Sequence, residues 1–151
     1  MELETIAMLD RMETPLGTAV VRLGIAAALG AVIGIDREAR QHSAGLRTHI
    51  LICLAACLFT LISAELFARF ADAGGNMDPT RVIEAVTAGV AFLAAGTIIR
   101  GEGGVKGLTT GAGMWLAGAI GCATGVGLYL LAIIATVLAV IVLSLVKFFE
   151  R

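Results

Sequence analysis

The sequence predicts an all-α fold, a polytopic membrane bundle of five transmembrane helices. Of its 151 residues, 58% are hydrophobic and only 15% are charged, whereas soluble domains carry about 25% charged residues. The mean hydropathy is +0.94. Because a helix that crosses a bilayer needs about 20 apolar residues, the length accommodates five spans in a single membrane domain over residues 1–151. The net charge of −1 argues against nucleic acid as a partner, since phosphate binding needs a basic surface.

The apolar runs of the sequence set the position of each helix. Three of them are separate and of spanning length, whereas the uncharged stretch over residues 107–146 corresponds to about 60 Å of helix, twice the thickness of the hydrocarbon core. We therefore expect this stretch to fold back at the glycine-rich residues 121–127. The predicted spans cover residues 16–35, 50–67, 82–99, 107–124 and 128–147.

Positive charges predict the orientation of the bundle, because cytoplasmic loops are enriched in Lys and Arg. Seven of the eleven basic residues fall on one side of the five predicted spans: Arg37, Arg40, Arg47, Arg100, Lys106, Lys147 and Arg151. This side is predicted to be cytosolic. The N-terminus is then outside, the C-terminus is in the cytosol, and the lipid bilayer is the main partner.

Five charged residues are expected in or near the outer half of the bilayer. Arg22 lies within the first span, about 9 Å from its start, and an unpaired charge at that depth is costly. One interpretation is a buried ion pair of Arg22 with Glu84 or Glu65. The other is that Arg22 reaches toward the headgroups while both acids are interfacial. Asp78 and Arg81 precede the third span and complete this predicted outer charge cluster.

A second polar group is expected on the cytosolic side, where the first span ends and the second begins. Its members are Asp36, Arg37, Glu38, Arg47, Thr48, His49 and Arg100. These residues either cap helices and anchor the protein to anionic lipid, or form a gate, an ion site or a docking surface. Mg²⁺ keeps several waters and needs only one or two carboxylates, so Asp36 with Glu38, or Asp78 with Glu84, is a candidate Mg²⁺ site. We expect no other cofactor.

No residue set at a known catalytic spacing is present, so we expect no enzyme activity. Pairs of glycines at helical spacing indicate close helix contacts, either within one chain or between the chains of a homodimer or other homo-oligomer. These residues are Gly30, Gly34, Gly107, Gly111, Gly121 and Gly125. Aligning the chain with itself brings Arg22 onto Glu84 and Gly34 onto Gly96, which predicts that spans one and two form a parallel repeat of spans three and four.

Several ordered blocks resemble the membrane domain of the MgtC/SapB family over about residues 17–130. The blocks begin at Gly30, Ala44, Asp78, Phe92 and Gly107; they read GxxxGxDRE, AGLRTH, DPxRV, FLxAGxIIR and GLTT, and Trp115 follows the last of them. Asp36, Arg37, Arg47, Thr48, His49, Asp78, Arg81 and Arg100 fall on motif positions. The chain departs from the family pattern at Ala85, Ala91, Ala94 and residues 111–114.

This resemblance implies a bacterial inner-membrane protein, a short form without the soluble C-terminal domain of longer members. It implies a link to growth at low Mg²⁺ and, in pathogens, to virulence. The first functional hypothesis is a non-enzymatic protein that regulates another membrane complex. The second is a cation (Mg²⁺) transporter or channel-like oligomer, whose weakness is the absence of acidic residues near the middle of the spans. A purely structural or lipid-binding bundle is the third.

Overall fold

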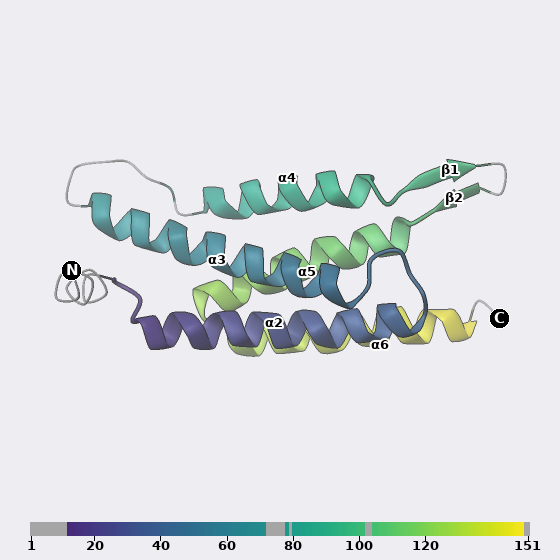
Figure 1. Ribbon diagram of the computed structural model, residues 1–151, viewed down its shortest axis with the longest axis horizontal. Coiled ribbons are helices and arrows are strands. Elements are labelled where there is room, and N and C mark those ends of the chain that lie inside the picture. Colours follow the sequence, from purple (N-terminus) through teal and green to yellow (C-terminus); the bar gives the residue numbers. More distant parts are fainter. Residues whose placement is uncertain (1–11, 72–77, 79, 102–103, 150–151) are drawn as a thin grey trace.

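The computed structural model describes residues 12–71, 78, 80–101 and 104–149. Within these ranges five α-helices and one small β-hairpin follow each other along the chain (Figure 1). The elements are α2 (Leu16–Ala39), α3 (Leu46–Ala71), α4 (Arg81–Ala95), β1 (Ile99–Gly101), β2 (Gly104–Lys106), α5 (Leu108–Val126) and α6 (Tyr129–Phe149). The predicted all-α class is confirmed, apart from the hairpin. Arg151 lies outside the described residues.

The third helix differs most from its predicted span. The predicted span reached residue 99, but α4 ends at Ala95, because the backbone N–H groups of Thr97 and Ile98 turn back to the carbonyls of Ala94 and Ala95. The chain then enters the antiparallel pair β1–β2, in which Ile99 pairs with Lys106. A glycine with φ of 101° at position 104 starts the return strand, a conformation that glycine adopts without strain.

Two of the helices have the length and apolar composition of a membrane span. They are α2 and the Leu46–Phe70 part of α3, and Tyr129–Ser144 of α6 is a shorter apolar stretch. The 15 residues of α4 rise only about 22 Å, less than the roughly 30 Å core of a bilayer. The five crossings and their orientation therefore stay predictions.

The helices pack in three layers, with α4 on one side, α3 and α5 in the middle, and α2 and α6 on the other side (Figure 1). The glycine pairs lie where neighbouring helices cross. A Cβ on Gly30 would stand 2.7 Å from the His49 carbonyl oxygen, and one on Gly34 would stand 2.7 Å from Leu46 Cα. Glycine is therefore needed where α2 crosses α3.

The glycines of α5 serve the same purpose. A Cβ on Gly121 would overlap the Cys53 carbonyl, one on Gly125 would stand 2.6 Å from Thr60 Cβ, and one on Gly111 would touch Ala94 of α4. Gly107, with φ of 91°, joins the hairpin to α5, where a Cβ would overlap the carbonyl of Thr97. All six predicted contact glycines therefore meet neighbours within their own chain.

The directions of the helices agree with the predicted parallel repeat. The hairpin of α2 and α3 and the hairpin of α4 and α5 each fold back on themselves in the same sense (Figure 1). Their connections differ, because a short loop joins α2 to α3 whereas the strands β1 and β2 lie between α4 and α5. We call the two ends of the bundle the Asp36 end, where α2 finishes, and the Arg22 end, where α5 meets α6.

Candidate functional site

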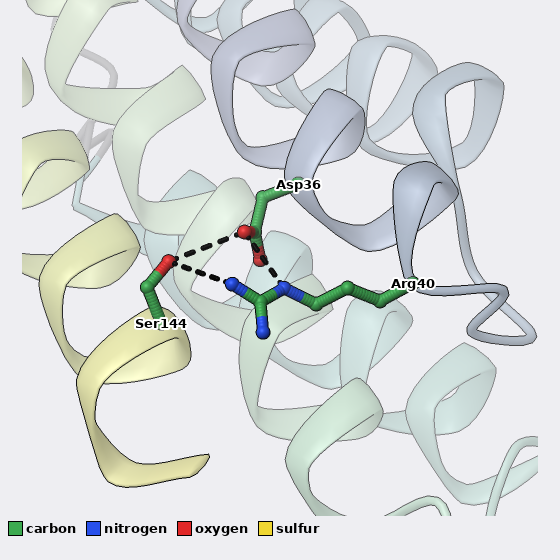
Figure 2. A network of polar contacts seen from close by, with 3 residues as sticks. All are labelled: Asp36, Arg40 and Ser144. Atoms are coloured by element: carbon green, nitrogen blue, oxygen red, sulfur yellow. Dashed lines mark hydrogen bonds and ion pairs between the residues drawn. The ribbon is translucent and has the colours of Figure 1, made fainter. Parts of the chain in front are cut away.

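A cluster of polar side chains at the Asp36 end joins four helices. It contains Asp36 and Arg37 of α2, Arg40 directly after that helix, His49 of α3, Thr110 of α5 and Ser144 of α6. Arg40 Nε donates to Asp36 Oδ1 at 2.9 Å, and the Ser144 hydroxyl donates to the same oxygen at 3.2 Å while accepting from Arg40 Nη2 at 3.3 Å (Figure 2). This triangle fixes the end of α2 to α6.

Arg37 points to the other side of α2 and is almost fully buried, with 2% of its surface exposed. Its Nη2 lies 3.4 Å from the Thr110 hydroxyl in the first turn of α5, a long hydrogen bond. Its Nε is buried and has no partner. The neighbouring carboxylate of Asp36 is turned to Arg40. The guanidinium is therefore only partly satisfied.

His49 is fully buried at the start of α3. Its Nδ1 lies 2.9 Å from the Gly45 carbonyl, which only accepts, so Nδ1 carries the proton and Nε2 of the neutral ring is an acceptor. This Nε2 is buried without a partner. It faces Gly113 of α5, where an added Cβ would lie 3.6 Å away.

Three buried polar atoms of the cluster have no hydrogen-bond partner among the described residues: Asp36 Oδ2, Arg37 Nε and His49 Nε2. Buried polar atoms normally have hydrogen-bond partners, so these atoms mark a polar site. Two guanidiniums and one carboxylate make it net positive with the histidine neutral. Within the described residues, no group of three or more His, Cys, Asp or Glu side chains could hold a metal ion. A Mg²⁺ ion would find one carboxylate here and would have to keep its waters.

The other residues that the sequence predicts for the cytosolic side lie outside the cluster and have separate roles. The Glu38 carboxylate accepts the Leu46 backbone N–H at 3.0 Å and so caps the start of α3, where a Cβ on Gly45 would overlap it. Arg47 is exposed on α3, and Arg100 is exposed on β1. Thr48 lines a pocket of about 460 Å³ between α3 and α4. Only Asp36, Arg37 and His49 of the predicted set enter the buried cluster.

The predicted ion pair of Arg22 with Glu84 or Glu65 is replaced by a different contact. Arg22 Nη1 donates to the Gly125 carbonyl at 2.7 Å, near the C-terminus of α5, where the helix dipole carries partial negative charge. Glu65 instead accepts the backbone N–H of Thr14 at 2.8 Å, and Glu84 is exposed. Among the described side chains, neither acid forms an ion pair with Arg22.

Asp78 and Arg81 lie at the start of α4. Asp78 Oδ1 accepts the Thr80 hydroxyl at 2.6 Å and the Thr80 backbone N–H at 2.9 Å. These hydrogen bonds, the hydroxyl first, hold the pKa of Asp78 below its ordinary value. Both Asp78 and Arg81 are exposed, so this pair marks the start of a helix and is separate from Arg22.

Sequence reasoning did not place Arg40, Thr110 and Ser144 in the site. Arg40 follows Asp36 by four residues, a spacing that brings side chains together on a helix, so the sequence could have predicted this contact. Thr110 belongs to the GLTT block, one of the blocks that resemble the MgtC/SapB family. Ser144 interrupts an apolar run, but no spacing in the sequence connects α6 with α2.

Comparison with known proteins identifies the family. A model described as the MgtC family matches residues 23–151. The putative magnesium transporter YhiD of Escherichia coli K12 is 38% identical over 126 residues, which cover 83% of this chain and 59% of that protein. Protein SapB of Bacillus subtilis is 39% identical over 112 residues, covering 73% and 48%. Protein MgtC of Brucella abortus (strain 2308) is 35% identical over 133 residues, covering 88% and 53%.

The chain spans about half the length of the curated relatives it matches. No solved structure matches it. The family model covers most of the chain, and it includes the end of α2 and the starts of α3 and α5, which carry the buried cluster. The chain therefore belongs to the MgtC family, as its resemblance to the MgtC/SapB group predicted.

Proposed function

We propose that this protein is a non-enzymatic, multi-pass protein of the bacterial inner membrane that supports growth at low Mg²⁺ by regulating another membrane complex. In pathogens the same role would contribute to virulence. Its N-terminus would be outside and its C-terminus in the cytosol. It would not itself carry Mg²⁺ across the membrane. The observation that carries this proposal is the placement of arginine at both ends of α5.

The two arginines oppose the passage of a cation along the contact between α2 and α5. Arg22 binds the Gly125 carbonyl at one end of α5, and Arg37 approaches Thr110 at the other. In a medium with an effective dielectric constant of about 20, a Mg²⁺ ion roughly 8 Å from one guanidinium is repelled by about 4 kcal/mol. That energy lowers local occupancy by about a thousandfold.

Negative charge is scarce where a cation pathway would need it. In the buried cluster the only carboxylate is that of Asp36, and one of its oxygens is shared by Arg40 and Ser144. Cation pathways in membranes are typically lined by acidic side chains, or by backbone carbonyls freed from helices. The helices α2, α3 and α5 are instead continuous over their described residues, so they free no backbone carbonyls along their length.

An action through contacts with other proteins fits the surface of α4. Ile83, Phe92 and Leu93 of this helix are exposed in this single chain, and Phe92 is the most exposed of them at 80%. Such a helix needs an apolar neighbour, which is lipid, a second copy of the chain or a helix of the regulated complex. We expect a homodimer or other homo-oligomer to leave one such face for that complex.

Cation transport remains the second candidate, because one observation favours it. Asp36 Oδ2 is buried and has no partner, and a relative 38% identical to the chain is called a putative magnesium transporter. A hydrated Mg²⁺ ion could bind this single oxygen through its waters. In that case the Asp36 carboxylate, and not the arginines, would control the activity.

The two functions are separated in bacteria that lack their own family member and grow at limiting Mg²⁺. Cells receive the full chain, the Asp36→Asn variant, or Arg69→Gln as an exposed control that lies outside both predicted charge groups. Growth rate and the initial rate of Mg²⁺ accumulation are measured in the same cultures. A regulator improves growth without faster accumulation. Transport is indicated instead if growth and accumulation rise together and Asp36→Asn abolishes both.

A further inference from the structure

A pocket of about 680 Å³ opens between α3, α4 and α5 at the Arg22 end of the bundle. Its lining is mostly apolar and includes Val86 and Val90 of α4 and Trp115 of α5. Along α5 the lining runs from Trp115 to Val126, a distance of about 16 Å in a helix. The pocket is therefore a slot that follows the helix axes.

Arg22 is the only charged residue among the described side chains that line this slot. Its Nη1 is bonded to the Gly125 carbonyl, but its Nε is buried and has no partner in the described part of the chain. The C-terminus of a helix carries only about half a negative charge. Roughly half of the positive charge of the guanidinium is therefore left for another group to neutralise.

Hydroxyl groups lie toward the same end of the slot as Arg22. Ser63 belongs to the later part of α3 and Thr80 immediately precedes α4, and both line the pocket. Val90 and Trp115 form the opposite end. The slot thus has a polar, positively charged end and a long apolar end, which is the complement of an anionic amphiphile.

We propose that this slot binds one acyl chain of an anionic phospholipid, with the lipid phosphate at Arg22. A free phosphate ion would satisfy the guanidinium but leave the apolar slot unfilled. A zwitterionic phospholipid would fill the slot but bring its own cation beside the phosphate, and a lipid without charge would leave Arg22 uncompensated. An anionic phospholipid does both. The proposal rests on the membrane location given above, and it does not depend on whether the protein regulates a complex or transports Mg²⁺.

The same lipid would steady α4. This helix lies between the slot and the second pocket, of about 460 Å³, and Val86 and Val90 line both. The helix therefore contacts its neighbours along a narrow strip of side chains, with a pocket on each side. Filling the slot would bury more apolar surface of α4 on the side that faces α5, so occupancy would hold α4 against α5.

Trp115 provides the test, because it is the only tryptophan of the chain and it lines the slot. The full chain is reconstituted into zwitterionic vesicles that contain a small fraction of phosphatidylglycerol with brominated acyl chains, which quench tryptophan on contact. Phosphatidylcholine with the same brominated chains is the comparison. We expect anionic lipid to quench about fivefold more effectively at equal mole fraction, as expected for one basic side chain acting on an anionic lipid.

Three variants identify the site. Arg22→Gln should bring the ratio of anionic to zwitterionic quenching close to one. Ala119→Phe fills the slot while keeping the arginine, and it should also remove the preference. Arg47→Gln changes an exposed arginine outside the slot and should leave the ratio unchanged. If Arg22→Gln does not fold, Ala119→Phe decides alone.

Several outcomes overturn the proposal. Equal quenching by the two brominated lipids in the wild type would show that the slot does not select an anionic lipid. Loss of the preference on addition of inorganic phosphate would assign Arg22 to a free anion. Tryptophan that neither lipid quenches, together with cross-linking between chains at the slot, would assign it to a second copy of the protein.

Discussion

Replacing Gly30 by alanine tests the close crossing of α2 and α3 on which the buried cluster depends. A Cβ at this position would stand 2.7 Å from the His49 carbonyl oxygen, 3.0 Å from Ile50 Cα and 3.1 Å from Cys53 Cβ. Ordinary van der Waals contact begins at 3.4 Å. All three neighbours are backbone atoms or a Cβ, so no side chain can rotate away and the two helices must separate.

The magnitude follows from that geometry. The closest contact is short by about 0.7 Å, and adding a methyl group to a well-packed contact typically costs about 1–3 kcal/mol. Gly24 is the matched control on the same helix, since a Cβ there meets nothing within 4 Å. In Gly24→Ala the gain in helix propensity should stabilise the protein by about 0.5–1 kcal/mol. Because both variants gain the same helix propensity, they should differ by the steric cost alone, roughly 1–3 kcal/mol.

The assay is equilibrium unfolding of each variant in mixed micelles with increasing dodecyl sulfate, followed by circular dichroism. We expect Gly30→Ala to unfold at a lower dodecyl sulfate fraction than the wild type and Gly24→Ala at an equal or higher one. Because the new methyl group would press on the backbone of His49, Gly30→Ala should also lose the growth benefit at low Mg²⁺. Equal stability of the two alanine variants would refute the close crossing.

Three further substitutions probe the polar contacts. Glu38→Ala removes the acceptor of the Leu46 N–H and should lower the free energy of unfolding by about 0.5–2 kcal/mol, in the same micelle assay; no change would mean that water replaces the cap. Ser144→Ala removes both hydrogen bonds of α6 to the end of α2 and should lower the free energy of unfolding by about 1–2 kcal/mol. Unchanged stability would mean that Asp36 and Arg40 need no third partner. Arg37→Met should be nearly neutral or stabilising but should abolish the growth benefit; a loss of several kcal/mol would show that the guanidinium is fully paired.

The apolar runs predicted the helices well, because burial of long apolar segments dominates the choice of structure in such a chain. The end of α4 was not predictable from hydropathy. Ile98 and Ile99 continue the apolar run, yet the backbone turns back at Ala94 and Ala95 and the following residues pair as strands. Hydropathy records which side chains avoid water, and it does not record where the backbone changes its hydrogen bonding.

The candidate site was predictable only in part. Asp36, Arg37 and His49 attracted attention as polar residues beside apolar runs, and the structure brings all three into one buried cluster with Ser144 of α6. The partner of Arg22 was missed, because sequence reasoning searched for opposite charges. A helix C-terminus offers carbonyl groups instead, and only the packing of α2 against α5 brings the Gly125 carbonyl to the guanidinium.

Mg²⁺ movement across a bilayer that contains only this protein tests the central claim most directly. The purified full chain is reconstituted into liposomes that hold a Mg²⁺-sensitive dye, beside protein-free liposomes and liposomes treated with an ionophore. Because Arg22 and Arg37 place positive charge at both ends of α5, we expect uptake equal to that of the protein-free liposomes. Uptake by the wild type that Asp36→Asn abolishes would contradict the claim and identify the protein as a transporter.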